Sequence, residues 1–526
     1  MAARSTLLLS PPQAVGCLLS GLLGLSALGL ALSAAAHQPM PLLGSGAALL
    51  LLLVLIHVLR AGRNRPDRTE GSHGSACWGN PRELVQLSGL ILGRLNRHLL
   101  RYECEGHLLT VAPTGSGKGV STVIPNLLDY PGSVVVLDLK GENHAVTAPR
   151  RAQLGRVEVL DPFRLRGDQT AAFNPLTLID PDSDLCDADA ATLAYLLVVP
   201  NAEGDGAFWE DEAVALLSGL ILYVVAHEPP ERQHLGTVRE HLTSSAAAWT
   251  RLHQAMVASN RAHGLIARAA HRLAQKADRE RSGVLSTAQR HTHFLDSPAI
   301  LRTLTTSTLE LSQLKTETLS LYCVIPPERL GSHGRWLRLV AGSAVHAMLR
   351  APHRSPHRVL FVLDEFAQLG RLQPVEQALT LLRGYGVQLW LLVQDFAQLR
   401  ATYGTRLDSI LANATVLQAF GTNDVQTAEY LSRRSGQTTV LSASENRSTG
   451  QSFNRPILST RQSSEAHSST ESARPLLTPD EILRLDSSKQ LLFLSGADPL
   501  LVDRANYLRD TLFRGTYSPN PMHPET

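Results

Sequence analysis

The stretch HLLTVAPTGSGKG, residues 107–119, decides the fold of this chain. Its apolar start indicates a buried strand, and the glycine-rich turn that follows carries Lys118 to the start of a helix. Such a turn directs backbone N–H groups at a point where the helix dipole also favours negative charge, and the lysine adds a full positive charge for the outer phosphates. The pattern therefore predicts a phosphate-binding P-loop in the strand–turn–helix context that such a loop requires.

The expected nucleotide-binding residues follow one another along this loop. They are Pro113, Thr114, Gly115, Ser116, Gly117, Lys118, Gly119 and Val120. The loop departs from the common G-x-x-x-x-G-K-[ST] pattern at both ends, since Ala112 replaces the first glycine and Gly119 replaces the hydroxyl residue that normally holds Mg²⁺. We expect Ser121 or Thr122, a little further along the helix, to reach the ion directly or through water.

A second motif, VLFVLDE at residues 359–365, ends an apolar strand in two carboxylates. Carboxylates at the end of a buried strand are costly unless positive charge lies opposite them. We assign Asp364 to the Mg²⁺ shell and Glu365 to the general base that polarises the attacking water. Together with Lys118 the pair predicts an ATP site, because the carboxyl ends of parallel strands meet at one rim of the sheet.

Three further residues are candidates for the same rim. Gln394 ends the next apolar strand, LWLLVQ, where its amide can sense the γ-phosphate or position water. Arg383 lies on the intervening helix and is either an arginine finger toward a neighbouring subunit's nucleotide or a surface arginine. Asp138 ends the strand VVVLD and has either a functional or a structural role.

Short apolar runs alternate with amphipathic stretches around these motifs, which predicts an α/β fold with a parallel sheet between helices. Several runs are almost wholly apolar, as strands covered on both faces are. The expected strands are His107–Val111, Ser133–Asp138, Val157–Leu160, Leu319–Val324, Val359–Leu363, Val387–Val393, Thr415–Phe420 and Gln490–Leu494.

The alternation stops between residues 180 and 299, where helical spacing without a convincing strand predicts an inserted all-α domain. This segment begins acidic and ends basic. Its basic part, from Arg261 to Arg290, is either a solvated helix face or a surface for phosphate or a partner. Residues 442–474 are rich in Ser, Thr, Asn and Gln and predict a long polar loop or a β-arm.

The expected domain organisation follows from these boundaries. It comprises a transmembrane hairpin (1–60), a juxtamembrane linker and entry segment (61–106), a nucleotide-binding domain (107–179 with 300–515), the all-α domain for substrate or DNA recognition (180–299), the polar segment (442–474) and a flexible tail (516–526).

Two apolar runs, residues 14–36 and 42–59, are each long enough to cross a bilayer. Arg4 precedes the first run and several arginines follow the second, whereas the connection between the runs carries no Lys or Arg. The positive-inside rule then predicts a multi-pass protein of the bacterial inner membrane, in contact with membrane lipid, whose termini and catalytic domain are cytoplasmic. A secretory signal peptide is the alternative for the first run.

Composition narrows the possible partners. The formal net charge of +2 excludes a globally basic nucleic-acid coat, so any binding to a phosphate backbone needs a local patch. The cysteines are few, and no two of them have the spacing of metal ligands or a redox pair. Scarce cysteine fits a reducing compartment and argues against disulfides and structural zinc.

In these motifs the chain resembles the type IV secretion coupling proteins, the TraG/VirD-type conjugative ATPases. The motifs stand in the family's order over about residues 74–515. They are GSACWG (74–79), APTGSGKGVSTVIPNLL (112–128), SVVVLDLKGEN (133–143), AAFNPL (171–176), VLFVLDEFAQLG (359–370), QDFAQLRATYG (394–404) and NDVQTAEYLSRRSG (423–436).

This resemblance implies a RecA-like P-loop NTPase with an inserted all-α domain, which forms a homo-hexamer with ATP and Mg²⁺ between its subunits. It implies delivery of relaxase-bound single-stranded DNA or effector proteins to the components of a type IV secretion channel. By the same resemblance Lys118 is the phosphate-binding lysine, Asp364 and Glu365 are the metal and water carboxylates, and Gln394 is the sensor. Arg383 stands roughly where related motors keep an arginine finger.

Two other functions are considered. A catalytically silent adaptor would bind nucleotide and recruit substrates without hydrolysis. A solute transporter is disfavoured, because two short spans without charged or broken midplane segments offer no path for a solute. Whether the cargo is DNA or protein stays open, and the basic run up to Arg290 favours nucleic acid slightly.

Overall fold

The computed structural model describes residues 73–522 except for short internal gaps. The gaps are residues 87, 104, 168, 200–204, 352–355, 373–374, 377–378, 380–381 and 454–458. The expected membrane hairpin, with both apolar runs and the predicted lipid contact, lies outside the described residues. The prediction of a multi-pass membrane protein is contradicted, because no helix within the described part is both long and apolar enough to cross a bilayer.

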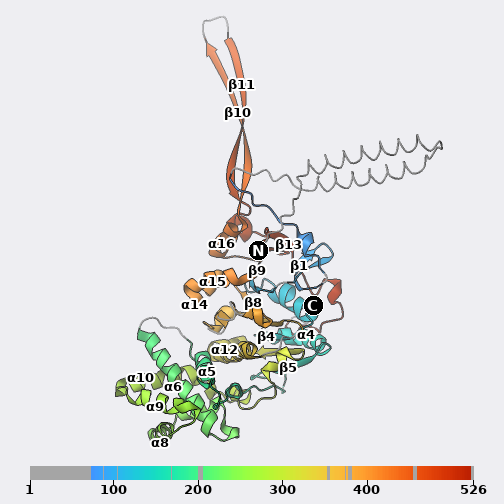
Figure 1. Ribbon diagram of the computed structural model, residues 1–526. Coiled ribbons are helices and arrows are strands. Elements are labelled where there is room, and N and C mark those ends of the chain that lie inside the picture. Colours follow the sequence, from blue (N-terminus) through green and yellow to red (C-terminus); the bar gives the residue numbers. More distant parts are fainter. Residues whose placement is uncertain are drawn as a thin grey trace, which may run out of the picture. The chain divides into compact units, whose positions relative to one another are not determined.

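An 11-stranded sheet forms the centre of the described unit, in the order β2-β1-β13-β12-β9-β3-β8-β7-β4-β6-β5 (Figure 1). Neighbours from β9 to β5 are parallel, and β12, β13, β1 and β2 extend one edge antiparallel. This mixed α/β fold with a large parallel-rich sheet confirms the predicted class. The strands are β1 Leu90–Leu95, β2 His98–Tyr102, β3 His107–Val111, β4 Val134–Asp138, β5 Arg156–Leu160, β6 Leu319–Val324, β7 Val359–Leu363, β8 Val387–Val393, β9 Ala414–Ala419, β12 Lys489–Leu494 and β13 Leu500–Asp503.

The eight predicted strands are all present, with ends shifted by no more than one residue, but β1, β2 and β13 were not predicted. β1 and β2 fall in residues 61–106, which were expected to be a linker and an entry segment. They pair with each other, and β1 also pairs with β13, at the antiparallel edge. Strand β2, HLLRY, has a single fully buried residue, and such a sequence carries little apolar signal.

Helices cover both faces of the sheet. They are α3 Ile124–Asp129, α4 Glu142–Ala152, α5 Cys186–Leu197, α6 Asp205–His227, α7 Leu235–Leu242, α8 Ala246–Val257, α9 Leu265–Ala274, α10 Asp278–Thr292, α11 Pro298–Arg302, α12 Pro327–Arg350, α14 Phe396–Tyr403, α15 Leu407–Asn413, α16 Val425–Ser435 and α17 Pro479–Leu483. Short 3-10 turns are η1 Pro81–Leu84, η3 Pro175–Leu178, η4 Pro230–Arg232, η5 Ala262–Gly264, η6 His293–Asp296, η7 Leu311–Lys315, η8 Phe366–Leu369, η9 Leu382–Tyr385, η10 Gly404–Arg406 and η11 Thr511–Phe513, and η2 Gly119–Val123 is a π-helical turn.

Alternate residues of the central strands point to different cores. On one face, Leu109 and Leu363 pack in a large cluster that includes Trp336 of α12 and the helices α5 to α7. On the other face, Leu108 and Val362 pack in a second cluster with residues of η2 and α3. The strands are therefore buried on both sides, which is why they are nearly all apolar.

Between β5 and β6 the described residues form the helices α5 to α11, several of which gather in one group (Figure 1). The basic run of this segment is largely neutralised by acidic side chains. Its ion pairs are Arg261–Asp182, Arg272–Glu212, Lys276–Glu212 and Arg281–Asp278. Most of the run therefore stabilises the helical group internally and presents less free positive charge than its sequence suggests.

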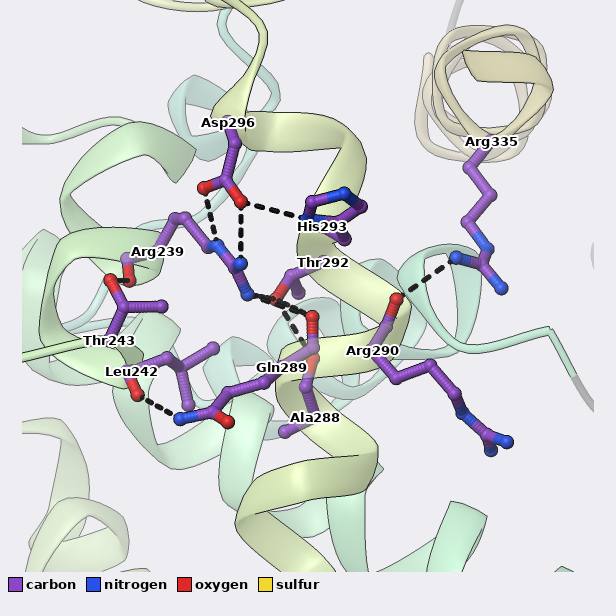
Figure 2. A network of polar contacts seen from close by, with 10 residues as sticks. All are labelled: Arg239, Leu242, Thr243, Ala288, Gln289, Arg290, Thr292, His293, Asp296 and Arg335. Atoms are coloured by element: carbon purple, nitrogen blue, oxygen red, sulfur yellow. Dashed lines mark hydrogen bonds and ion pairs between the residues drawn. The ribbon is translucent and has the colours of Figure 1, made fainter. Parts of the chain in front are cut away.

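A polar network fixes the end of α10 inside this group (Figure 2). The Arg239 guanidinium of α7 donates to both oxygens of Asp296, at 2.7 and 2.6 Å, and to the carbonyl of Gln289 at 2.8 Å. From α12, Arg335 donates to the carbonyl of Arg290 at 3.1 Å. The helical segment is thus joined to a helix that packs on the sheet.

Residues 442–453 and 459–474 lie in a separate two-stranded antiparallel sheet formed by β10 (Gln437–Phe453) and β11 (Ser459–Pro475). Of the two structures considered for this segment, the β-arm is present. At its base the amide of Ala76 donates to the carbonyl of Gln437 at 2.9 Å.

Of the segment expected to be a flexible tail, the structure describes residues 516–522, and these contact α4 and Tyr507. The amide of Ser518 donates to the carbonyl of Val146 on α4, and the Asn520 amide donates to Glu142 at 2.5 Å. Tyr517 packs edge-on against Tyr507 with ring centroids 4.8 Å apart. Polar anchors hold this segment to α4, and the aromatic pair joins it to Tyr507 after β13; a short polar sequence gave no reason to expect either contact.

Candidate nucleotide site

The P-loop turn leaves β3 at its carboxyl end and enters the π-helical turn η2, which continues into α3. Gly115 and Gly117 have φ values of +78° and +84°, a conformation that residues with a Cβ rarely adopt. Lys118 begins the helix with right-handed backbone angles. The predicted nucleotide-binding residues, numbers 113–120, thus form one continuous segment that leads from the turn into the helix N-terminus.

The acidic pair follows β7 directly. Glu365 has a φ of +51°, a left-handed conformation that is uncommon for a residue other than glycine and that is found at functional sites. Lys118 Nζ lies 3.1 Å from Glu365 Oε1 and 3.8 Å from Asp364 Oδ1. The lysine of the P-loop and the two strand-end carboxylates therefore converge, as the two motifs predicted.

Strand order explains why Gln394 belongs to the same group. β8 lies between β3 and β7, so the two motif strands are not direct neighbours and the end of β8 enters the gap between them. Gln394, which follows β8, donates from Nε2 to Glu365 Oε2 at 2.8 Å. Gln368 donates to the same oxygen at 3.2 Å. Both oxygens of Glu365 are therefore held, one by Lys118 and the other by two amides.

Burial raises the pKa of Asp364 above its ordinary range; Lys118 opposes this shift and Glu365 adds to it. Burial likewise raises the pKa of Asp138, at the end of β4, to about 6, although backbone N–H groups such as that of His144 stabilise its charged form. The charge of Asp364 contributes to that second shift, so Asp138 shares this rim. Lys118 contacts two carboxylates, Asp364 and Glu365, and no group of three or more possible metal ligands occurs among the described residues. Asp364, beside Lys118 at this rim, stays the predicted Mg²⁺ residue.

Ser121 does not have a free hydroxyl for such an ion. Its Oγ donates to the carbonyl of Gly117 at 2.8 Å and accepts from Arg504 Nη2 at 2.8 Å. An oxygen that already accepts from a guanidinium is a poor ligand for a second cation. The Thr122 hydroxyl lies 3.5 Å from that of Ser121, and Thr122 is fully buried.

Arg504 was missed by the sequence analysis. It follows β13, a strand between β1 and β12 that was not predicted, and its guanidinium reaches the P-loop. No motif in the linear sequence marks it, because the strand order alone brings residue 504 beside residue 117. For Arg383, the structure places the backbone in η9 (Leu382–Tyr385), and its side chain lies outside the described part.

Comparisons with known proteins agree with this geometry. Residues 82–525 match the family model described as Type IV secretory system Conjugative DNA transfer. The conjugal transfer protein TraG of Escherichia coli is 30% identical over 510 residues, which cover 86% of this chain and 78% of that protein. The type IV secretion system-coupling protein VirD4 of Bartonella quintana (strain Toulouse) is 28% identical over 431 residues, covering 80% and 65%.

Solved structures share the fold at lower sequence identity. The plasmid coupling protein TrwB in complex with the non-hydrolysable ATP analogue ADPNP aligns with a TM-score of 0.62 at 15% identity, covering 84% of this chain and 97% of that one. TrwB in complex with ADP and Mg²⁺ aligns with the same score at 16% identity, covering 83% of this chain and 94% of that one. The chain belongs to the type IV secretory system conjugative DNA transfer family, the coupling ATPases of conjugation.

Proposed function

We propose that this chain hydrolyses ATP at the rim formed by Lys118, Asp364 and Glu365, and that hydrolysis drives cargo to a type IV secretion channel. The observation that carries the proposal is the convergence of Lys118 Nζ on both carboxylates, at 3.1 and 3.8 Å. A cation on a glycine turn beside strand-end carboxylates is the arrangement that phosphoryl transfer from a nucleotide requires. TrwB, which shares the fold, is described in complex with an ATP analogue and with ADP and Mg²⁺.

Each residue has a separate task in this proposal. Lys118 and the N–H groups of the turn bind the outer phosphates, and Asp364 holds Mg²⁺, which neutralises developing charge when bound. Glu365 accepts a proton from the attacking water. Gln394 and Gln368 both donate to Glu365 Oε2. Oε1 is thereby directed toward Lys118.

A ring is proposed for the active assembly, a homo-hexamer with its sites between subunits. Thr114 and Gly115 at the tip of the P-loop are exposed, so one side of the phosphate site is open to a neighbouring copy. Arg383 of that neighbour is the proposed arginine finger.

The helical residues 180–299 are proposed as the substrate-recognition domain. Relaxase-bound single-stranded DNA and effector proteins are both compatible with it. Because Glu212 and Asp182 neutralise much of the basic run, free positive charge is left mainly on Arg268, Arg279 and Arg290, which take part in no ion pair among the described residues. So few unpaired arginines favour contact with a few phosphates over an extended track of DNA.

The test uses three substitutions, each assayed for nucleotide binding, ATP hydrolysis with DNA supplied, and cargo delivery in cells. Lys118→Ala is expected to lose binding, hydrolysis and delivery. Glu365→Gln is expected to bind ATP but to hydrolyse it about 10²–10⁴-fold more slowly, and to stop delivery. Glu429→Gln, the same type of change at an exposed position of α16, is the control and is expected to behave as the wild type.

The alternative, a nucleotide-binding adaptor that does not hydrolyse ATP, predicts a different outcome. It requires that Glu365→Gln delivers cargo at the wild-type rate. Normal delivery by that variant would therefore overturn the motor and favour the adaptor.

A further inference from the structure

The feature behind this inference is the arginine that follows β13. Arg504 Nη2 donates to the carbonyl of Ser116 at 2.5 Å and to the carbonyl of Gly117 at 3.2 Å. These two carbonyls belong to the turn of the P-loop, next to Lys118. A side chain distant in sequence is therefore bonded to the backbone of the phosphate-binding loop itself.

The planarity of the peptide bond gives these contacts a consequence. In a trans peptide unit the carbonyl of one residue and the N–H of the next point in opposite directions. By holding the carbonyls of Ser116 and Gly117 on its own side, Arg504 turns the N–H groups of Gly117 and Lys118 the other way. Those are the donors that a P-loop offers to phosphate oxygens.

The guanidinium is itself fixed from several sides. Nη1 donates to the carbonyl of Ser487 at 2.8 Å, and Nη2 donates to Ser121 Oγ at 2.8 Å. Its carbon atom lies 4.1 Å from the centroid of the buried Phe420 ring, in a cation–π contact. In the described part of the chain no ion pair joins Arg504 to a carboxylate, so its charge remains directed at the loop.

Gly117 shows how close this approach is. A Cβ placed on Gly117 would lie 2.8 Å from Arg504 Nη2, which is closer than real Cβ contacts come. Glycine at this position therefore serves two purposes, since it permits the φ of +84° and leaves room for the guanidinium.

We propose that Arg504 is a positioning residue for the phosphates of the nucleotide, because it locks the peptide units of Ser116 and Gly117 with their N–H groups facing the phosphate site. It acts through the loop and does not itself touch the nucleotide. The inference rests on the proposed nucleotide function of Lys118, and it adds a requirement that the P-loop motif alone does not contain.

The test measures phosphate binding and turnover separately in the full chain. The binding probe is inorganic pyrophosphate with Mg²⁺, followed by titration calorimetry. For Arg504→Ala we expect the Kd for pyrophosphate and the KM for ATP to rise about tenfold, the effect of losing charge-assisted hydrogen bonds. We expect kcat to change by less than about twofold, because the lost contacts bind substrate and transition state alike.

Two further variants keep the test sharp. Arg504→Lys retains the charge but not the fork of donors, so only part of the affinity is expected to return. Arg509→Ala removes an exposed arginine from the same segment and is expected to bind pyrophosphate as the wild type does. Thermal unfolding of each variant shows whether it is folded. If Arg504→Ala is not folded, the measurements on Arg504→Lys decide the test.

The outcomes separate this inference from the proposed function. If Lys118→Ala binds pyrophosphate as tightly as the wild type, the nucleotide site itself is wrong. If Lys118→Ala loses binding while folded Arg504→Ala and Arg504→Lys keep wild-type Kd and KM, only the role of Arg504 is overturned. A fall in kcat at unchanged KM for the Arg504 variants, or an equal loss in Arg509→Ala, overturns it as well.

Discussion

Lys118 and Glu365 form an ion pair of 3.1 Å between the P-loop and the strand-end acid. If phosphate binds Lys118 as proposed, we expect the lysine to exchange a carboxylate for phosphate oxygens when a nucleotide binds. Glu365 is then released on one side while Gln394 and Gln368 still hold the other. The geometry therefore links arrival of the substrate to freeing of the general base.

The first prediction concerns Gln394. Replacing it by Ala removes the 2.8 Å hydrogen bond to Glu365 Oε2 and leaves that oxygen with only the 3.2 Å hydrogen bond from Gln368. We expect kcat to fall by about 10–100-fold with little change in KM, since the contact orients the base and does not bind substrate. Gln368→Ala is the matched control, because its longer 3.2 Å contact to the same oxygen comes from an exposed side chain. An equal loss in both variants would contradict a special role for Gln394.

The second prediction concerns the missing P-loop hydroxyl. A Cβ added at Gly119 would meet only the Cδ1 atom of Ile124, at 4.0 Å, so a serine fits without strain. We expect Gly119→Ser to lower the Mg²⁺ concentration that half-saturates nucleotide binding, because Ser121 cannot offer its engaged hydroxyl. Gly119→Ala, which adds the Cβ without the oxygen, should leave the Mg²⁺ requirement unchanged. A shift of equal size in both variants would exclude a ligand effect.

The third prediction is a dependence of stability on pH. The pKa of Asp138 rises from 3.8 to about 6 in the folded chain, chiefly because the carboxyl is buried. The folded state therefore holds this proton more tightly than the unfolded state, and its contribution to stability is lost as pH rises from about 4 to 6. Asp138→Asn should raise the free energy of unfolding by on the order of 2–3 kcal/mol above about pH 7 and change it little below about pH 4. Thermal unfolding at the two pH values measures this, and an equal effect at both would contradict it.

The P-loop, the acidic pair and Gln394 were predictable because each follows an apolar strand, and strand ends of a parallel sheet share one rim. The position of Arg504 was not predictable from the sequence. It depends on the antiparallel pairing of β13 with β1 and β12, and no sequence motif indicates that pairing. Ion pairs such as Arg272–Glu212 could not be predicted from the sequence either, because they join residues of different helices. Periodicity reports which face of an element is buried, but it does not report what lies opposite that face.

The fourth prediction concerns single-stranded DNA. If the unpaired arginines of the helical segment contact phosphates, the double variant Arg268→Ala with Arg279→Ala should lower the slope of log affinity against log salt by about 1.4. Arg272→Ala should change the slope less, because Arg272 already neutralises Glu212 at 2.8 Å. Binding isotherms at several salt concentrations measure the slopes. A slope that stays at the wild-type value in the double variant would place the DNA contact elsewhere.

The last prediction concerns Arg338 of α12, which is almost wholly buried. Its guanidinium donates to the carbonyls of Tyr195 and Leu196 at the end of α5, at 3.0 and 2.9 Å, where the helix dipole favours a cation. It also donates to the carbonyls of Leu369 and Arg371, in the segment that follows Asp364 and Glu365. One buried charge thus joins the helical segment to the loop behind Glu365.

Removing this charge should lower the stability of the fold and also weaken the coupling between the helical segment and ATP hydrolysis. Arg338→Ala leaves buried carbonyls without a donor, and we expect it to lower the free energy of unfolding by about 3 kcal/mol. We also expect DNA to stimulate its ATP hydrolysis less than in the wild type, because the helical segment no longer holds the loop after Glu365. Arg335→Ala, on the same helix, cuts only the 3.1 Å contact to Arg290 and should keep the stimulation. Since a general loss of stability would reduce basal and stimulated hydrolysis alike, a stimulation ratio in Arg338→Ala equal to that of the wild type would refute the link.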